Sequence, residues 1–347
     1  MGEGARVCKC DFRHSEVYDV DCTGMIVAKP FEIIVEKPAT GIEAQISVLI
    51  SCYKYGKEAT EALDSLLEQS EPSINIVLVD DHSPDDSVAI LTEWFTHHGA
   101  HQKLSSIKFI RHVENHGLSQ TRNTALSLIE TPYTFILDAD NQVYPRALTI
   151  LREALENSGY PMAYSLVEKF GIEKGIIDNS LWIPQKFSYG NYIEAMTLVR
   201  TEVLKELGGY RQMPNKFGWE DYDLWCSFVD RGLKGCHVPQ ILCRYRVHKG
   251  SMIRNVTNAF VESEMEKVRH DFEAHHNMPF YFLSGPRRRR QILRRALSPS
   301  GAEERVRVAR ALCSRLPLPK RTRHSLLVWI LSHLRALERR RIQCIGL

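Results

Sequence analysis

The chain has 347 residues, of which 44% are hydrophobic and 25% charged, an ordinary globular composition with enough length for one large domain plus appendages. The net charge of +3 hides an uneven distribution, because residues 286–347 hold 17 of the 45 Lys and Arg residues and only 3 of the 42 Asp and Glu residues. An acidic body with a basic tail suggests that the tail meets an anionic surface. No uninterrupted apolar run reaches the roughly 18–20 residues of a membrane-spanning helix.

The first 44 residues are expected to form an N-terminal extension with short strands at residues 17–21 and 25–28. Nine cysteines are scattered along the whole chain without a recognisable secretory signal, so we interpret them as mostly free thiols in a reducing compartment and expect a cytoplasmic protein. Four N-terminal side chains are of zinc-binding types, but their spacing matches no common zinc module, and a metal site there stays an open alternative. They are Cys8, Cys10, His14 and Cys22.

Strands and helices alternate regularly from Gln45 onward. Apolar residues such as Ala59, Leu63 and Leu66 recur at helical spacing, and Ser83 before Pro84 is typical of a helix start. Four apolar strands are predicted at residues 46–50, 74–79, 107–110 and 133–137. Helices are predicted at residues 57–69, after Ser83, through Arg122 and over residues 144–156. This order predicts an α/β fold with a Rossmann-like, mainly parallel sheet and helices on both faces.

Beyond residue 160 the alternation breaks. Strands are predicted there at residues 161–170, 192–200 and 241–247, and helices at residues 202–207 and 219–229. From about residue 256 the chain is expected to be helical and increasingly basic.

Paired carboxylates stand at the carboxyl ends of two predicted strands. Asp80 and Asp81 follow residues 74–79, and Asp138 and Asp140 follow the very apolar segment 133–137. Ligands of parallel α/β sheets bind beyond the carboxyl ends of the strands, so the two pairs indicate one polar site. Two anionic oxygen donors on one short turn suit a divalent metal that holds phosphates, as in nucleotide-sugar enzymes. The alternative for each pair is an ordinary strand-to-loop turn, where Asp is common.

Six ordered segments resemble motifs of glycosyltransferase family 2, the inverting sugar transferases with a GT-A fold. They are residues 46–55, 79–83, 115–123, 137–140, 217–221 and 245–251. The similarity extends from about residue 46 to residue 254, and it departs from the family at Tyr53-Lys54, where Tyr-Asn is usual. It implies a GT-A domain over residues 45–255, between the extension 1–44 and a helical, basic C-terminal extension 256–347.

The resemblance implies metal-dependent transfer, with inversion, of a sugar from a nucleotide-diphosphate sugar, with UDP the expected nucleotide, to an acceptor hydroxyl. Asp140 would bind Mn²⁺ or Mg²⁺ directly, and Asp138 would support the metal or the ribose. His248 would add a nitrogen ligand that favours Mn²⁺; the alternative is a surface loop histidine. Asp81 would accept a hydrogen bond from the base, and Asp80 would support the ribose side or a helix end.

The same resemblance assigns the base that deprotonates the acceptor hydroxyl to Asp221. Arg122 would face the diphosphate, since a guanidinium suits phosphate geometry, and would otherwise be an exposed helix charge. Glu220 and Asp223 are neighbours that favour the amino end of a helix. Trp219 would stack on a sugar ring or, equally well, pack in the core.

Three other functions fit parts of the sequence. A sugar nucleotidyltransferase would share the sheet and the carboxylates, but residues 50–56 lack a Gly-rich phosphate loop with Arg or Lys. A non-catalytic sugar-nucleotide-binding or scaffold protein would not need both carboxylate motifs. Nucleic-acid binding is not expected, because Arg287–Arg290 has no interleaved aromatic residues and belongs to no recognisable module.

The C-terminal tail carries apolar residues at helical spacing, flanked by arginines, from Arg323 to Arg341. This composition is typical of a helix that lies in a membrane interface, which predicts peripheral contact with the anionic inner face of a membrane. The alternative is that the apolar stripe packs on the catalytic domain or on a partner subunit. The acceptor is expected to be a carbohydrate, a lipid-linked molecule or a protein. The apolar residues are Leu326, Leu327, Ile330, Leu331, Leu334 and Leu337.

Overall fold

The computed structural model describes residues 26–280, apart from residues 40, 178, 180, 214–217 and 251–263. Contacts divide the chain into one compact unit over Met1–Phe280 and a second over Tyr281–Leu347, and the second lies outside the described residues. The predicted zinc-type residues, the strand at residues 17–21 and the amphipathic tail therefore also lie outside them. None of the helices within the described ranges has the length and apolar character to cross a bilayer.

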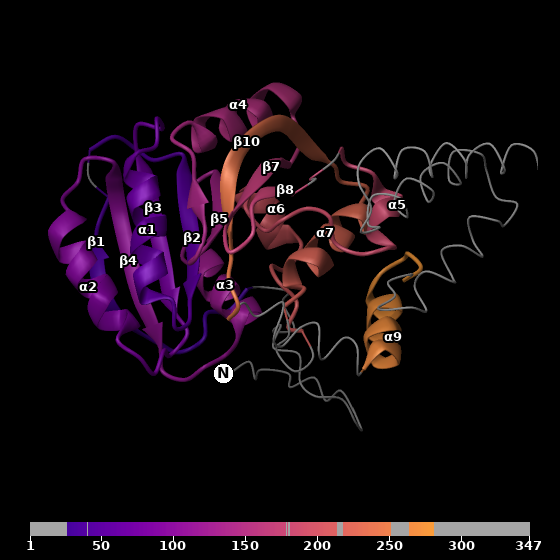
Figure 1. Ribbon diagram of the computed structural model, residues 1–347, viewed down its shortest axis with the longest axis horizontal. Helices are drawn as coiled ribbons and strands as arrows, with labels where there is room; N and C mark the ends of the chain where they lie inside the picture. Colours follow the sequence, from indigo (N-terminus) through magenta and orange to yellow (C-terminus); the bar gives the residue numbers. More distant parts are fainter. Residues whose placement is uncertain are drawn as a thin grey trace, which may run out of the picture. The chain divides into compact units, whose positions relative to one another are not determined.

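The described elements are built around one large mixed sheet (Figure 1). The strands are β1 Phe31–Lys37, β2 Ile46–Cys52, β3 Ile74–Asp80, β4 Leu104–His112, β5 Tyr133–Asp138, β6 Gln142–Val143, β7 Met162–Gly171, β8 Gly175–Ile177, β9 Thr197–Arg200 and β10 Gly235–Val247. The helices are α1 Gly56–Leu67, α2 Ser87–His98, α3 Leu118–Ser127, α4 Ala147–Ser158, α5 Pro184–Phe187, α6 Thr201–Glu206, α7 Glu220–Asp230 and α9 Met265–His275.

The strand order is β1-β4-β3-β2-β5-β9-β7-β10-β6, with β8 paired to β7. The four strands β4, β3, β2 and β5 run parallel, which confirms the predicted parallel centre and all four predicted strands. β9 is antiparallel to both β5 and β7, and β7 is parallel to β10. The strands β5, β7 and β10 therefore point the same way, and their carboxyl ends lie at one edge of the sheet.

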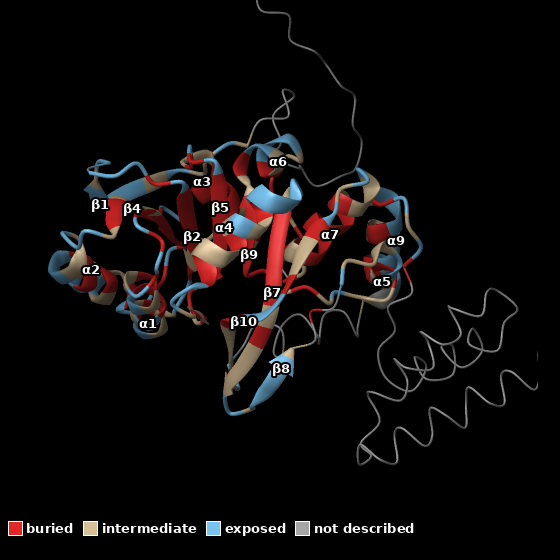
Figure 2. Ribbon diagram, turned by 90° about the horizontal axis from the view of Figure 1, so that it is seen from above, coloured by how far each residue is buried: buried red, intermediate tan, exposed pale blue. Residues whose placement is uncertain are grey.

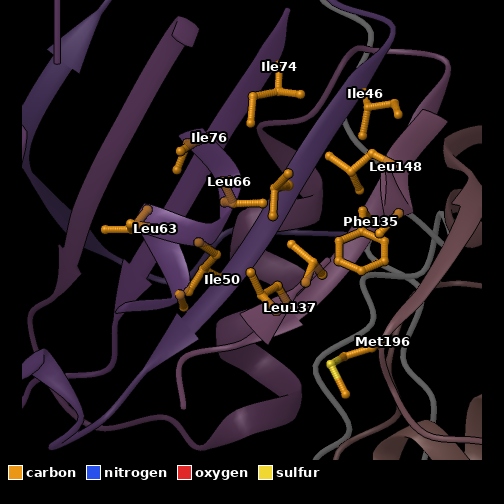
Figure 3. Close-up of a cluster of buried hydrophobic side chains, with 14 of the residues drawn as sticks. Ile46, Ile50, Leu63, Leu66, Ile74, Ile76, Phe135, Leu137, Leu148 and Met196 are labelled. Carbon is orange, nitrogen blue, oxygen red and sulfur yellow. The ribbon is translucent and has the colours of Figure 1, made fainter. Parts of the chain in front are cut away.

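The apolar strands form the core because they are covered on both faces. Ile46, Val48 and Ile50 of β2 pack in one cluster with residues of α1, α2 and α4, as Figure 3 shows for part of it. Leu49 and Ile136, whose side chains alternate to the other face, are equally buried, and α3 contacts β2 and β3. Figure 2 shows α1 and α2 on the opposite side of the sheet from α3.

Three local predictions were wrong. The second helix begins at Ser87 rather than after Ser83, because Ser83 ties its loop instead: its N–H donates to Asp80 and its hydroxyl accepts from the N–H of Lys54. The predicted strand at residues 192–200 is reduced to β9, and the carbonyl of Ile193 accepts the indole N–H of Trp225 on α7.

The third error concerns the chain before the predicted domain. Residues 26–28 form no strand, whereas residues 31–37 form β1, which pairs antiparallel with β4. The pattern of β1 is hard to read because none of its seven residues is fully buried and its register shifts between Ile33 and Val35.

Candidate active site

Asp138 and Asp140 stand on the turn where β5 leaves the sheet. The strand brings them there because its residues before Asp138 are fully buried, whereas the turn after it faces the carboxyl edge. Asn141 stabilises the turn, since its N–H donates to the carbonyl of Asp138 at 3.0 Å. The two carboxylates have different partners, so they are not equivalent.

The Asp140 carboxylate faces His248, which directly follows β10. Its Oδ2 lies 3.1 Å from His248 Nε2, and the His248 ring packs edge-on against Tyr55 at 5.5 Å between ring centroids. Burial and the neighbouring Asp138 raise the pKa of Asp140 to about 6. The fold thus brings together two side chains that lie 108 residues apart, an oxygen and a nitrogen donor suited to Mn²⁺.

The Asp138 carboxylate is held by Arg122 of α3. The guanidinium donates to Asp138 Oδ1 at 2.6 Å and to Glu220 Oε1 at 2.6 Å, and it lies 5.1 Å from the ring centroid of Tyr210. Arg122 is only 1% exposed. Burial disfavours its charge, but Glu220 and Asp138 keep its pKa above the ordinary value. Arg122 was expected to face a diphosphate, and in the structure it links the end of β5 to the start of α7.

Asp221 lies in the first turn of α7 and is partly buried. Asn191 donates to its Oδ2 at 2.8 Å, and the N–H of Tyr222 donates to its Oδ1 at 2.7 Å. Burial and the adjacent Glu220 raise the pKa of Asp221 to about 7. The raised pKa makes this carboxylate a better proton acceptor than an ordinary aspartate.

The hydroxyl of Tyr245 on β10 is affected by the charges of four carboxylates. Burial raises the pKa of the Tyr245 hydroxyl, and so do the negative charges of Glu194, Asp138, Asp140 and Asp221. Glu194 was missed by the sequence reasoning, although a Glu inside the apolar segment 192–200 was the available signal. Burial and the carboxylates of Asp221 and Asp138 raise the pKa of Glu194 to about 8.

Asp80 and Asp81 lie at the end of β3, two strands away from Asp138. Asp81 is 4% exposed and accepts hydrogen bonds from His112 Nδ1 (2.8 Å) and from the N–H groups of His116 (2.9 Å) and Gly117 (2.7 Å). Burial alone would raise its pKa, but these hydrogen bonds lower it below the ordinary value. Asp81 thereby shapes the loop before α3.

Asp80 is fully buried and accepts the N–H of Ser83 at 2.8 Å, and burial raises its pKa. Its carboxylate therefore stabilises the loop after β3 through this hydrogen bond. The contacts of both residues at the end of β3 are internal to the protein, so their expected roles toward the base and the ribose stay predictions.

The remaining acidic residues of α7 have partners of their own. Glu220 is paired with Arg122, and Asp223 accepts from Arg211 Nε at 2.9 Å and lies 2.9 Å from His276 Nε2. These ion pairs go beyond the helix-end role expected of the two residues. The Trp219 ring contacts the ring of Tyr222 at 5.5 Å between centroids, a packing role.

No three His, Cys, Asp or Glu side chains within the described ranges converge so as to hold a metal ion by themselves. Asp140 and His248 would supply two protein ligands to a metal that completes its coordination with water and substrate phosphates. The geometry thus defines an acidic site that includes the Asp140–His248 pair, and Arg122 links Asp138 to Glu220, the neighbour of Asp221.

Several known proteins that resemble this chain are glycosyltransferases by name. The model of the family described as "Glycosyl transferase family 2" matches residues 47–212. A relative from Escherichia coli, named UDP-Glc:alpha-D-GlcNAc-diphosphoundecaprenol beta-1,3-glucosyltransferase WfaP, is 23% identical over 246 residues, which cover 69% of this chain and 93% of WfaP.

Two solved structures share the fold. TarS 1-349 of S. aureus, in complex with UDP-GlcNAc, gives a TM-score of 0.55 at 17% identity and covers 86% of this chain and 92% of its own. The mannosyltransferase PcManGT of Pyrobaculum calidifontis, in complex with GDP-Man and Mn²⁺, gives 0.51 at 18% identity and covers 89% and 84%. The protein is a glycosyltransferase with the GT-A fold. The match to the family model is consistent with the expected glycosyltransferase family 2, and the shared fold confirms the expected GT-A architecture.

Proposed function

We propose that the protein transfers a sugar from a UDP-sugar to an acceptor hydroxyl with inversion, and that Asp221 is the general base. The observation that carries the proposal is the geometry of Asp221, whose two oxygens are both oriented by hydrogen bonds, one from Asn191 and one from the N–H of Tyr222. Burial and Glu220, which raise its pKa to about 7, support the proposal. A base with a pKa near the working pH is ionised often enough to accept a proton and strong enough to hold it.

The donor would occupy the carboxyl edge of the parallel strands, where α/β sheets bind nucleotides. Its uracil would lie toward Asp81, and its diphosphate toward Asp138 and Asp140. The names of two similar proteins support a uracil nucleotide: WfaP is a UDP-Glc transferase by name, and TarS was solved with UDP-GlcNAc. PcManGT was solved with GDP-Man, so a guanine nucleotide is the alternative to test.

The residues of the Asp–His pair fit a divalent metal, Mn²⁺ or Mg²⁺, held by Asp140 and His248 with Asp138 in support. Their donor atoms lie 3.1 Å apart, and the Mn²⁺ in the PcManGT structure supports a metal in this fold. When bound, the metal would neutralise charge on the leaving diphosphate. The protein's own part is to hold Asp138 in place through Arg122, so that the rim keeps its shape when a donor binds.

The acceptor would lie on the side of Asp221, Asn191 and Glu194. Because the name of WfaP includes a diphosphoundecaprenol-linked sugar, we propose a lipid-linked acceptor. Such an acceptor would bring the protein to the cytoplasmic face of a membrane, with the basic tail as a peripheral contact. The four described cysteines are free thiols, as a reducing compartment allows.

A two-stage experiment tests the function. Thermal shifts with a panel of nucleotide sugars and Mn²⁺ would identify the donor, and a UDP-sugar should give the largest shift. Release of nucleotide diphosphate would then be measured with candidate acceptors for the parent and for Asp221→Asn. Asp86→Asn, an exposed carboxylate before α2, is the matched control and should keep full activity. Pyrophosphate as the product would instead indicate a nucleotidyltransferase.

A further inference from the structure

Two large apolar side chains are exposed on one hairpin. β7 and β8 pair antiparallel, with Lys169 opposite Gly175, and the turn between them spans residues 172–174. Ile172 in the turn and Ile176 on β8 are each 57% exposed. Figure 2 shows β8 as an exposed segment at the end of β7 and β10. Residues 169–177 form the hairpin tip.

Lysines surround these isoleucines. Lys174 in the turn is exposed, and so is Lys249, which follows β10. The N–H of Ile172 donates to the carbonyl of Val247 at 3.0 Å, so the turn lies beside the chain that leads to Lys249. Lys169 lies 3.7 Å from Glu173, the acidic residue of the turn. The hairpin tip itself holds two lysines and one glutamate, and Lys249 beside it adds a further positive charge, so this region is positively charged.

The backbone holds the hairpin tip in place. Gly171 has φ +93°, in the region that favours glycine, and a Cβ there would lie 2.6 Å from the carbonyl oxygen of Val247. The turn is therefore fixed against β10 by a close approach that other residues do not permit. The isoleucines are presented to solvent by a defined backbone and not by a loose loop.

The hairpin tip projects from the edge of the sheet that carries the candidate site. β5, β7 and β10 end at the same edge, and His248, which contacts Asp140 at 3.1 Å, immediately follows Val247. Lys169 is also close enough to Glu194 to lower the pKa of that carboxyl against the effect of burial. A surface that meets the hairpin tip would therefore lie beside the site.

We propose that the hairpin tip contacts an anionic lipid surface, with Ile172 and Ile176 entering the headgroup region and the lysines meeting lipid phosphates. Interfacial binding grows with buried apolar area plus attraction to anionic lipid, and both components are present. Two isoleucines among solvated lysines form too small an apolar patch for a stable protein interface. The basic tail is a poor occupant, because its arginines would face these lysines. The contact requires no assumption about the sugar reaction.

Co-sedimentation of the full chain with phosphatidylglycerol–phosphatidylcholine vesicles tests the contact. Replacing both isoleucines (Ile172→Ser with Ile176→Ser), or Lys174→Glu alone, should lower the partition coefficient at least about fivefold. Ile33→Ser is the matched apolar control, since Ile33 is also 57% exposed but lies on β1 at the far edge of the sheet. Lys234→Glu is the charge control, at the amino end of β10. Both controls should bind like the parent, and pure phosphatidylcholine should bind weakly.

Amide hydrogen exchange of the parent, with and without vesicles, locates the contact independently of any variant. Protection of residues 172–177 by anionic vesicles supports the proposal. Protection confined to residues 286–347 would overturn it, because the tail would then bind alone. Protection that depends on protein concentration without vesicles would also overturn it and would indicate a second copy as the occupant. Neither measurement uses a sugar donor, so failure here is distinct from failure of the transferase function.

Discussion

Asn191 donates a hydrogen bond of 2.8 Å from its side-chain amide to Oδ2 of Asp221. Asn191 lies in the segment between α5 and β9, which is fastened to α7 where Trp225 donates to the carbonyl of Ile193. The other oxygen of Asp221 accepts the N–H of Tyr222. The carboxylate is therefore aimed by two different segments, which is the arrangement expected of a group whose direction matters.

Replacement of this carboxylate should separate binding from turnover. Asp221→Asn is expected to keep donor and metal binding and to lose roughly 10²–10⁴-fold in kcat, because only proton acceptance is removed. Calorimetry with the nucleotide sugar and steady-state kinetics measure the two quantities. Loss of donor binding with kcat intact at saturation would show that Asp221 belongs to the donor site.

Activity should fall on the acid side of neutrality. A base with a pKa of about 7 is active when ionised, so kcat/KM is expected to rise with pH through about 7 and then level off. Asn191→Ala removes a donor that favours the ionised form, so the pKa of Asp221 should rise and the acid limb should move to higher pH. If the acid limb of the kcat/KM profile stays at the same pH in Asn191→Ala and kcat is unchanged, Asn191 does not position Asp221.

The contact between Asp140 and His248 predicts that transfer depends on a divalent metal. Asp140→Ala should abolish transfer and weaken nucleotide diphosphate binding in the presence of Mn²⁺, while the fold survives because Asp140 lies beyond the end of β5. Manganese titration followed by electron paramagnetic resonance measures the site directly, and His248→Ala should weaken it less. Full activity of Asp140→Ala, or of the parent in excess chelator, would contradict metal dependence.

Arg122 should matter for stability as well as for activity. Arg122→Met leaves the buried Glu220 without its cation and is expected to lower the free energy of unfolding by about 3–5 kcal/mol. Urea denaturation checks it. Arg244→Met is the control, because the Arg244–Glu168 pair is partly exposed and its loss should change little. If both substitutions lower the free energy of unfolding equally, the buried ion pairs of Arg122 between β5 and α7 do not stabilise the protein more than an exposed pair does.

His276, which follows α9, should make the stability of this region depend on pH. It lies 2.7 Å from Asp230 and 2.9 Å from Asp223, while Arg211 and Asp271 complete the cluster. Burial lowers the pKa of His276, but the two carboxylates raise it above the ordinary value. Its contribution to stability should be complete below about pH 6.5 and be lost as the pH rises through the raised pKa. Denaturation of the parent against His276→Gln across this range measures it, and a constant difference would contradict the assignment.

The predictable part of this protein is the part with repeating patterns. The strands β2 to β5 are rich in apolar residues and are separated by helices of regular spacing, so their positions and their parallel direction could be predicted. The contacts of Arg122 could not, because a guanidinium at helical spacing looks the same whether it faces a phosphate or two buried carboxylates. Glu194 and Asn191 could not be predicted as site residues, because the irregular segment that carries them has no repeating sequence pattern. The start of the GT-A domain at residue 45 stays a prediction. β1, which precedes residue 45 in the chain, already pairs with β4 of the same sheet.

The pairing of β1 with β4 has a practical consequence for anyone who shortens this chain. A version that begins at Gln45 would leave the N–H and C=O groups along one side of β4 open to another molecule, and open strand edges recruit other chains into aggregates. β1 itself is a safer outer strand, since its register is interrupted between Ile33 and Val35 and it carries Glu32, Glu36 and Lys37. Residues 31–37 thus cover the edge of β4 that a chain beginning at Gln45 would leave open to other molecules.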